Sequence, residues 1–160
     1  MMTKTRRVLS GPAMAVLCAC LGCAGCSANR QDAVQSYTYE VQVSGETETV
    51  KITLDTSAGL ELRDDNGGFA IVTEAGTEAV SGSFAAASLF DQRHDQVTGS
   101  SQYTVLEDDT TYFIYTCHGT SGWETDCVAR PLGAGAAVVF TSLLDSEDAM
   151  EIYQQISVSL

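Results

Sequence analysis

The sequence is short of basic residues. It has eight Lys and Arg side chains against 21 Asp and Glu in a chain of 160 residues. The first 25 residues hold three of the basic side chains and no acidic one, so the other 135 carry a formal charge of −16. Nucleic-acid binding depends on clustered Lys and Arg, so this composition argues against a nucleic-acid partner. It argues equally against direct adsorption to an anionic membrane surface.

The sequence also lacks a hydrophobic run long enough for a comfortable membrane span. The apolar segment from Val8 to Leu21 has 14 residues and contains Pro12, whereas a spanning helix needs about 20. It follows the basic start MMTKTRR and precedes small residues and the polar stretch SANRQ. A basic start, an apolar middle and a small-residue exit are the layout of a secretory signal peptide.

Cysteines crowd the end of this apolar segment. The stretch Cys23-Ala24-Gly25-Cys26 resembles the lipobox of bacterial lipoproteins, which has a branched apolar residue, two small residues and an invariant cysteine. It departs from the family only at Cys23, where Leu is usual. The resemblance implies cleavage before Cys26, a diacylglyceryl group on its sulfur, and a protein anchored at the extracytoplasmic face of the cell membrane. Two acyl chains make a stable anchor.

Other interpretations of the segment stay open. Cys20, which follows Leu17 by three residues, is the second candidate for the lipid. Cleavage after Ala28 would release a soluble protein, and an uncut segment would form a strained span. The cysteines at 20, 23 and 26 have the spacing of an iron–sulfur run, but an export segment offers no folded surroundings to position metal ligands. We therefore expect no metal and no cofactor.

Beyond the anchor, hydrophobic periodicity predicts one globular domain. We expect a signal peptide over 1–25, a polar tether over 26–36 and an extracytoplasmic α+β domain over 37–160. Residues alternating with period two predict an antiparallel sheet of about seven or eight strands. The strands are expected within 37–43, 50–54, 59–62, 69–72, 102–106, 111–117, 127–130 and 136–143, with turns at Gly45 and at Asn66-Gly67.

Two helices complete the predicted domain. The Ala-rich stretch Phe84 to His94 predicts a short helix that Ser83 could cap, and SEDAMEIYQQI predicts a closing helix capped by Ser146. This order of elements is similar to that of small sheet-and-helix domains of the Mog1/PsbP-like type, which also end in a helix.

Cys117 and Cys127 are the only cysteines outside the export segment. An even pair in an exported protein predicts a disulfide, and closing this eleven-residue loop would be worth roughly 2.5–3 kcal/mol. A thiol nucleophile using His118 and Glu124 is disfavoured, because adjacent strand residues point to opposite faces. A zinc site from Cys117, His118 and Cys127 lacks an obvious fourth ligand.

The loop HGTSGWETD, from His118 to Asp126, holds the only Trp. Aromatic side chains exposed on rigid loops often form interfaces. We therefore take Gly119, Thr120, Trp123 and Glu124 as a candidate contact loop. The alternative is a glycine-rich hairpin tip with Trp123 folded back onto the sheet.

Sequence signatures of catalysis are missing. Ser121 lies in Gly-Thr-Ser-Gly rather than the G-x-S-x-G elbow, and no nucleophile, base and orienting group cluster. We therefore expect a non-catalytic binding or scaffolding domain, held at the membrane by its lipid, that contacts an unknown protein or small ligand. A small-ligand module with a pocket between sheet and helices is the alternative, and an unrecognised enzyme comes third.

Overall fold

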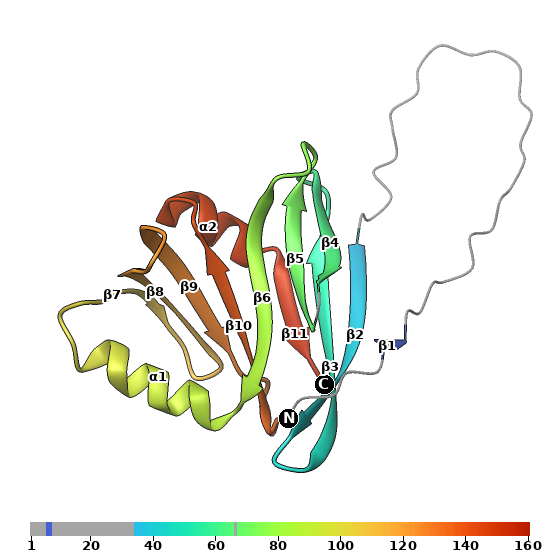
Figure 1. Ribbon diagram of the computed structural model, residues 1–160, viewed down its shortest axis with the longest axis horizontal. Coiled ribbons are helices and arrows are strands. Elements are labelled where there is room, and N and C mark those ends of the chain that lie inside the picture. The colour runs from blue at the N-terminus through green and yellow to red at the C-terminus, as the bar shows by residue number, and fades with distance from the viewer. Residues whose placement is uncertain (1–5, 8–33, 66) are drawn as a thin grey trace, which may run out of the picture.

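The computed structural model describes residues 6–7, 34–65 and 67–160. In this part of the chain two antiparallel sheets and two helices form an α+β fold, which confirms the predicted class (Figure 1). The elements are β1 (Arg6–Arg7), β2 (Val34–Val43), β3 (Glu46–Asp55), β4 (Leu60–Asp65), β5 (Gly68–Thr73), β6 (Glu78–Ala86), α1 (Ser88–Thr98), β7 (Thr104–Asp108), β8 (Tyr112–His118), β9 (Trp123–Ala129), β10 (Ala136–Ser142), α2 (Ser146–Tyr153) and β11 (Ile156–Ser159).

The strands form two sheets rather than the single one predicted. One sheet has the order β4-β5-β6-β10-β9-β8-β7, and the other has the order β1-β2-β3-β11. The main hydrophobic core lies between the two sheets and includes buried residues of α2. A smaller core lies on the other face of the larger sheet, beneath Phe90 and Val97 of α1. Helix α1 and the smaller sheet therefore cover opposite faces of the larger sheet.

The first hairpin forms as the alternating pattern predicts. Apolar side chains at every second position of β2 and β3 are buried, and the strands are joined at Ser44 and Gly45, which both have positive φ. Strand β2 begins at Val34, so the last three residues of the predicted tether are strand. Glu48 in β3 accepts hydrogen bonds from the backbone of Gly135 and Ala136, at 2.7 and 2.9 Å, and so links the smaller sheet to the start of β10.

The mid-chain helix begins four residues later than predicted. Phe84 to Ala86 belong to β6, where they pair with Val138 to Ala136 of β10. Helix α1 starts at Ser88 after Ala87, which makes no side-chain cap. The Ala-rich composition favours a helix locally, but the ladder to β10 and the burial of Phe84 favour a strand. Tertiary pairing therefore overrides helix propensity here.

The helix predicted from Ser146 forms but is shorter than expected, and a strand follows it. Helix α2 covers only Ser146 to Tyr153, and its cap is Asp145, whose carboxylate accepts from the Asp148 amide at 3.1 Å. Ile156, predicted to share the buried helix face, begins β11 and pairs with Leu54 of β3. The final residues therefore extend the smaller sheet.

An aromatic cluster fills the main core around a glycine. Phe69 in β5 and Phe140 in β10 both lie opposite Gly82 of the intervening strand β6. Their rings meet edge to face across it, with centroids 5.5 Å apart. A methyl group at Gly82 would overlap the Phe69 ring. The glycine is therefore required by packing, because only the missing Cβ leaves room for the rings.

The targeting features lie mainly outside the described residues. The lipobox, Cys26, Cys20 and most of the tether are not among them, and of residues 1–25 only the two-residue strand β1 is described. None of the helices in the described residues has the length and apolar character to span a membrane.

Candidate functional site

The β8–β9 hairpin places three potential ligand side chains on one face of the larger sheet. Its strands pair in continuous register, with His118 opposite Trp123 and Cys117 opposite Glu124. Asp126 lies two residues beyond Glu124 on β9, and so on the same face, because side chains alternate along a strand. The short turn between the strands thus brings together residues from both sides of the loop.

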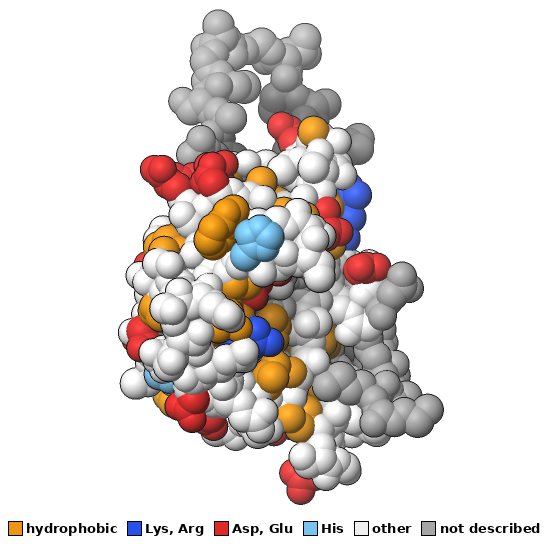
Figure 2. All heavy atoms as spheres, turned by 60° about the vertical axis from the view of Figure 1, so that its left-hand side comes forward, with side chains coloured by type: hydrophobic (Ala, Val, Ile, Leu, Met, Phe, Trp, Pro, Cys, Tyr) orange, Lys and Arg blue, Asp and Glu red, His pale blue; other side chains and the backbone are white. Residues whose placement is uncertain are grey.

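This face carries an open pocket beside α1, which we call the α1-side pocket. Helix α1 packs over Phe113, Val128 and Ala137. The pocket, with a volume of about 470 Å³, includes Cys117, Glu124 and Asp126 in its wall together with Arg93 of α1 and Tyr115 of β8. The surface on this side of the molecule is hollowed, and hydrophobic side chains meet acidic and basic ones there (Figure 2).

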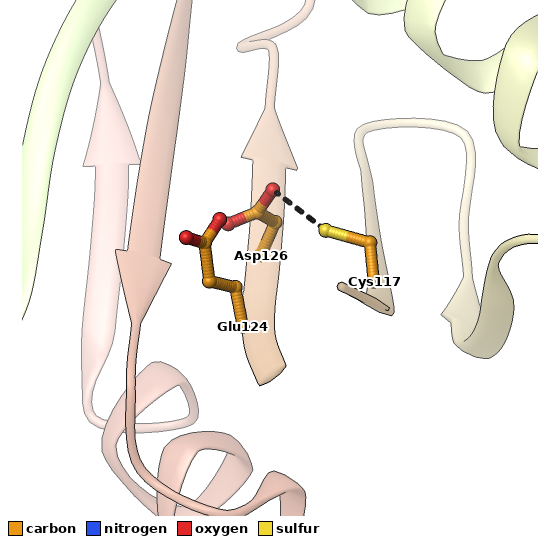
Figure 3. A group of neighbouring side chains, drawn as sticks. All are labelled: Cys117, Glu124 and Asp126. Atoms are coloured by element: carbon orange, nitrogen blue, oxygen red, sulfur yellow. Dashed lines mark hydrogen bonds between the residues drawn. The ribbon is translucent and has the colours of Figure 1, made fainter. Parts of the chain in front are cut away.

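The three side chains converge at the pocket wall. One potential ligand atom from each of Cys117, Glu124 and Asp126 lies within 4.8 Å of the others. The carboxylates of Glu124 and Asp126 turn toward each other, and the Cys117 sulfur faces Asp126 from the neighbouring strand (Figure 3). The Cys117 thiol donates toward Asp126 Oδ2 across 4.0 Å.

Asp126 is the most unusual group in the pocket. Its residue is only 7% exposed, and its Oδ2 accepts a 2.8 Å hydrogen bond from the Tyr115 hydroxyl. Its Oδ1 is buried and has no hydrogen-bond partner among the described residues. A buried carboxylate oxygen without a partner is costly. The arrangement is therefore suited to receive a positive charge or a hydrogen-bond donor.

The surroundings make the pocket electronegative. Burial, with Asp126 and Glu124 adding to it, raises the pKa of the Cys117 thiol. Burial and the neighbouring Asp126 raise the pKa of the Tyr115 hydroxyl. The Arg93 guanidinium, which donates to that hydroxyl at 3.2 Å, is the nearby cation and opposes both effects. Without a further cation the thiol stays protonated and the tyrosine stays a donor.

Glu124 is positioned by a glycine of the turn. A methyl group at Gly119 would overlap the Glu124 carboxylate, so that carboxylate lies directly over the Gly119 backbone. Replacement of Gly119 by a larger residue would therefore force the carboxylate to move. This gives Gly119, predicted as part of a contact loop, a packing role at the pocket.

The predicted disulfide between Cys117 and Cys127 is wrong for this fold. Both residues are free cysteines. Cys127 pairs with Ile114 and lies in the main core, whereas Cys117 packs against the smaller core on the opposite face. They are also three positions apart along the ladder, which is about 10 Å of strand, and a disulfide needs Cα atoms within about 7 Å.

The predicted contact loop is shorter than the stretch from His118 to Asp126. Strand β9 begins at Trp123, so Glu124 is a strand residue and only residues 119–122 form the turn. Trp123 does not fold back onto the sheet: it is 67% exposed and meets the His118 ring edge to face at 5.5 Å. Thr120 lies in the turn.

A second pocket, of about 280 Å³, lies between the sheets near the β7–β8 edge and includes Cys127, Phe140 and Tyr153 in its lining. Its carboxylate, Glu107, accepts a 3.1 Å hydrogen bond from Tyr112. The buried Cys127 thiol has its pKa raised to about 12, mainly by burial. This pocket is therefore mainly apolar, and the α1-side pocket offers more polar groups for recognition.

Comparison with known proteins leaves the chain unassigned. No known protein family, curated protein or solved structure matches it. The similarity to lipoproteins and to Mog1/PsbP-like domains thus remains a prediction from sequence.

Proposed function

We propose that this chain is a lipid-anchored, non-catalytic binding domain outside the cytoplasm, and that it binds a small cationic ligand in the α1-side pocket. The anchor is the diacylated Cys26, as the lipobox resemblance implies. The binding proposal combines the two leading expectations from the sequence, since it describes a binding domain with a small-ligand pocket.

The unpartnered oxygen of Asp126 carries the binding proposal. Asp126 is only 7% exposed, and although its Oδ2 accepts from Tyr115, its Oδ1 has no hydrogen-bond partner within the described part of the chain. Glu124 adds a second negative charge nearby. Proteins retain such unfavourable groups where binding needs them, at a cost in stability. A cation in the pocket would offset that cost.

Replacing Asp126 by Asn tests this proposal. Because Asn keeps an oxygen that can accept from Tyr115 and removes a buried charge, we expect the ligand-free variant to be at least as stable as the wild type. We further expect zinc, calcium or putrescine to raise the melting temperature of the wild type by several degrees near saturation, and not that of the variant. Thermal unfolding followed by circular dichroism measures both effects.

A structural role would give the opposite pattern. If Asp126→Asn lowers the unfolding free energy by more than about 1 kcal/mol, Asp126 stabilises the fold. If none of the three cations raises the wild-type melting temperature, the binding proposal is rejected. Glu78→Gln, an exposed carboxylate change in β6, is the matched control.

The anchor has a separate test. We expect Cys26→Ala to abolish incorporation of labelled palmitate and release the chain from the membrane, because the acyl chains are attached to that sulfur. Intact mass of the native protein extracted from membranes should show a diacylated N-terminal Cys26. Persistent labelling of the variant would place the lipid on Cys20 or Cys23, and an unlipidated native chain beginning at Asn29 would refute the lipoprotein proposal.

The β8–β9 hairpin is a second candidate contact. Trp123 exposes 67% of its surface, and exposed Trp side chains are enriched among residues that dominate interfaces. The same end of the hairpin thus offers an apolar contact beside the pocket, which suits a protein partner.

A further inference from the structure

We propose that Cys117, Glu124 and Asp126 form a binding site for a thiophilic divalent cation of the zinc class. The site rests on the proposed function, because it specifies which cation the α1-side pocket takes. It differs from the zinc site weighed from sequence, since His118 and Cys127 do not contribute.

The register of the hairpin supplies the geometry. Cys117 and Glu124 are directly opposite each other on β8 and β9, and Asp126 follows on the same face. One donor atom from each lies within 4.8 Å of the others. In a tetrahedral zinc site the sulfur and oxygen ligands are about 3.4–3.7 Å apart. Donors up to 4.8 Å apart therefore need to approach by about 1 Å to hold the ion.

The buried carboxylate of Asp126 is a second, independent observation that indicates a bound ligand at this site. Its Oδ1 turns toward the Glu124 carboxylate (Figure 3) and has no hydrogen-bond partner in the described residues. Two negative carboxylates that face each other repel, and a cation between them would remove this repulsion. A cation at this point would pair with both and with the Cys117 sulfur.

The surrounding residues resemble the supports that metal ligands require. Tyr115 donates to Asp126 Oδ2 and is itself contacted by Arg93, so one carboxylate is oriented by a hydrogen-bond chain. The Gly119 backbone lies against Glu124. Binding converts the thiol to a thiolate and releases its proton to solvent. The three negative ligands are then balanced by the divalent cation together with Arg93.

The sulfur ligand selects the class of ion. Calcium and magnesium take oxygen ligands, whereas a thiolate with carboxylates suits zinc and similar transition metals. Three protein ligands would leave a fourth tetrahedral position for water or a ligand group.

Cobalt(II) is the probe, because its bond to a thiolate gives a charge-transfer band in the near ultraviolet. The 160-residue chain is used with the export-segment cysteines replaced by serine, which leaves only Cys117 and Cys127 as cysteines. The replaced residues are Cys18, Cys20, Cys23 and Cys26. We expect one cobalt ion per chain with this band, and displacement of cobalt by zinc.

Variants locate the site. Cys117→Ser should abolish the band, and Asp126→Asn should weaken cobalt binding more than tenfold. Gly119→Ala should weaken binding about tenfold by displacing Glu124. The matched control Cys127→Ala removes the other thiol and should leave both band and stoichiometry unchanged. Circular dichroism of each variant verifies that it is folded.

Two results would overturn the inference: a band that persists in Cys117→Ser, or no binding of cobalt or zinc at millimolar concentration by the folded chain. If zinc does not bind, while calcium or putrescine stabilises the wild type but not Asp126→Asn, the metal site is rejected and the proposed cation-binding function is retained. If no cation stabilises the wild type, both fall.

Discussion

Replacing Gly82 by alanine is expected to lower the unfolding free energy by about 2–3 kcal/mol. The new methyl group would overlap the Phe69 ring at the centre of the main core, and overpacking a core costs about 1–3 kcal/mol or more. Alanine recovers only about 0.5–1 kcal/mol through reduced chain entropy in a strand, so the steric cost dominates. The melting temperature should fall by about 5–10 °C.

A double-mutant cycle isolates this cause. In a Phe69→Leu background the ring is absent, so the additional cost of Gly82→Ala should fall below about 1 kcal/mol. Ser83→Ala, on the same strand but exposed, should change stability by less than about 0.5 kcal/mol. An equal cost of Gly82→Ala in both backgrounds would show that ring overlap is not its origin.

Alkaline pH is expected to destabilise the protein through its buried thiol. Burial raises the pKa of Cys127 from 9.0 to about 12. Between these values the unfolded chain loses the thiol proton and the folded protein keeps it, so the unfolding free energy falls as pH rises. The slope from one such group is about 1.4 kcal/mol per pH unit, which gives a loss of about 3–4 kcal/mol across the interval. Tyr153, whose pKa burial also raises, adds to the loss above pH 10.

Urea unfolding at several pH values, with chelator and reductant present, measures this slope. Cys127→Ala should lower stability near neutral pH by lost packing, yet flatten the decline between pH 9 and 12. Cys117→Ala should reduce the decline of the unfolding free energy with pH by a smaller amount, because that thiol is only partly buried. If the unfolding free energies of Cys127→Ala and the wild type fall in parallel between pH 9 and 12, the buried thiol does not cause the loss of stability at alkaline pH.

Local patterns predict much of this fold. The alternation along 37–54 and the turn at Gly45 predict the first hairpin, because one face of each strand is buried and the turn needs positive φ. Strand β6 is not predicted, since Gly82 and the alanines after Phe84 resemble a loop and a helix. Their role depends on aromatic rings from β5 and β10, which no local pattern contains. The division into two sheets is likewise a matter of long-range pairing.

The three candidate metal ligands can be recognised from the sequence only if the pairing register of β8 and β9 is known. The sequence predicts that the strand begins at Cys127, which leaves Glu124 in the loop, so its pairing with Cys117 is not predicted. Extending both strands to a short turn over 119–122 would place Cys117, Glu124 and Asp126 on one face. The burial of Asp126, its hydrogen bond from Tyr115 and its unpartnered Oδ1 in the described structure depend on three-dimensional packing, which the sequence does not reveal.

The start of β2 has a consequence for how the domain is displayed. Val34 begins β2, and seven residues separate it from Cys26. These eight residue steps can span at most about 28 Å. In a chain lipidated at Cys26, the domain would therefore be held close to the bilayer surface. Access would then favour small diffusing cations and partners embedded in the same membrane over large assemblies approaching from outside.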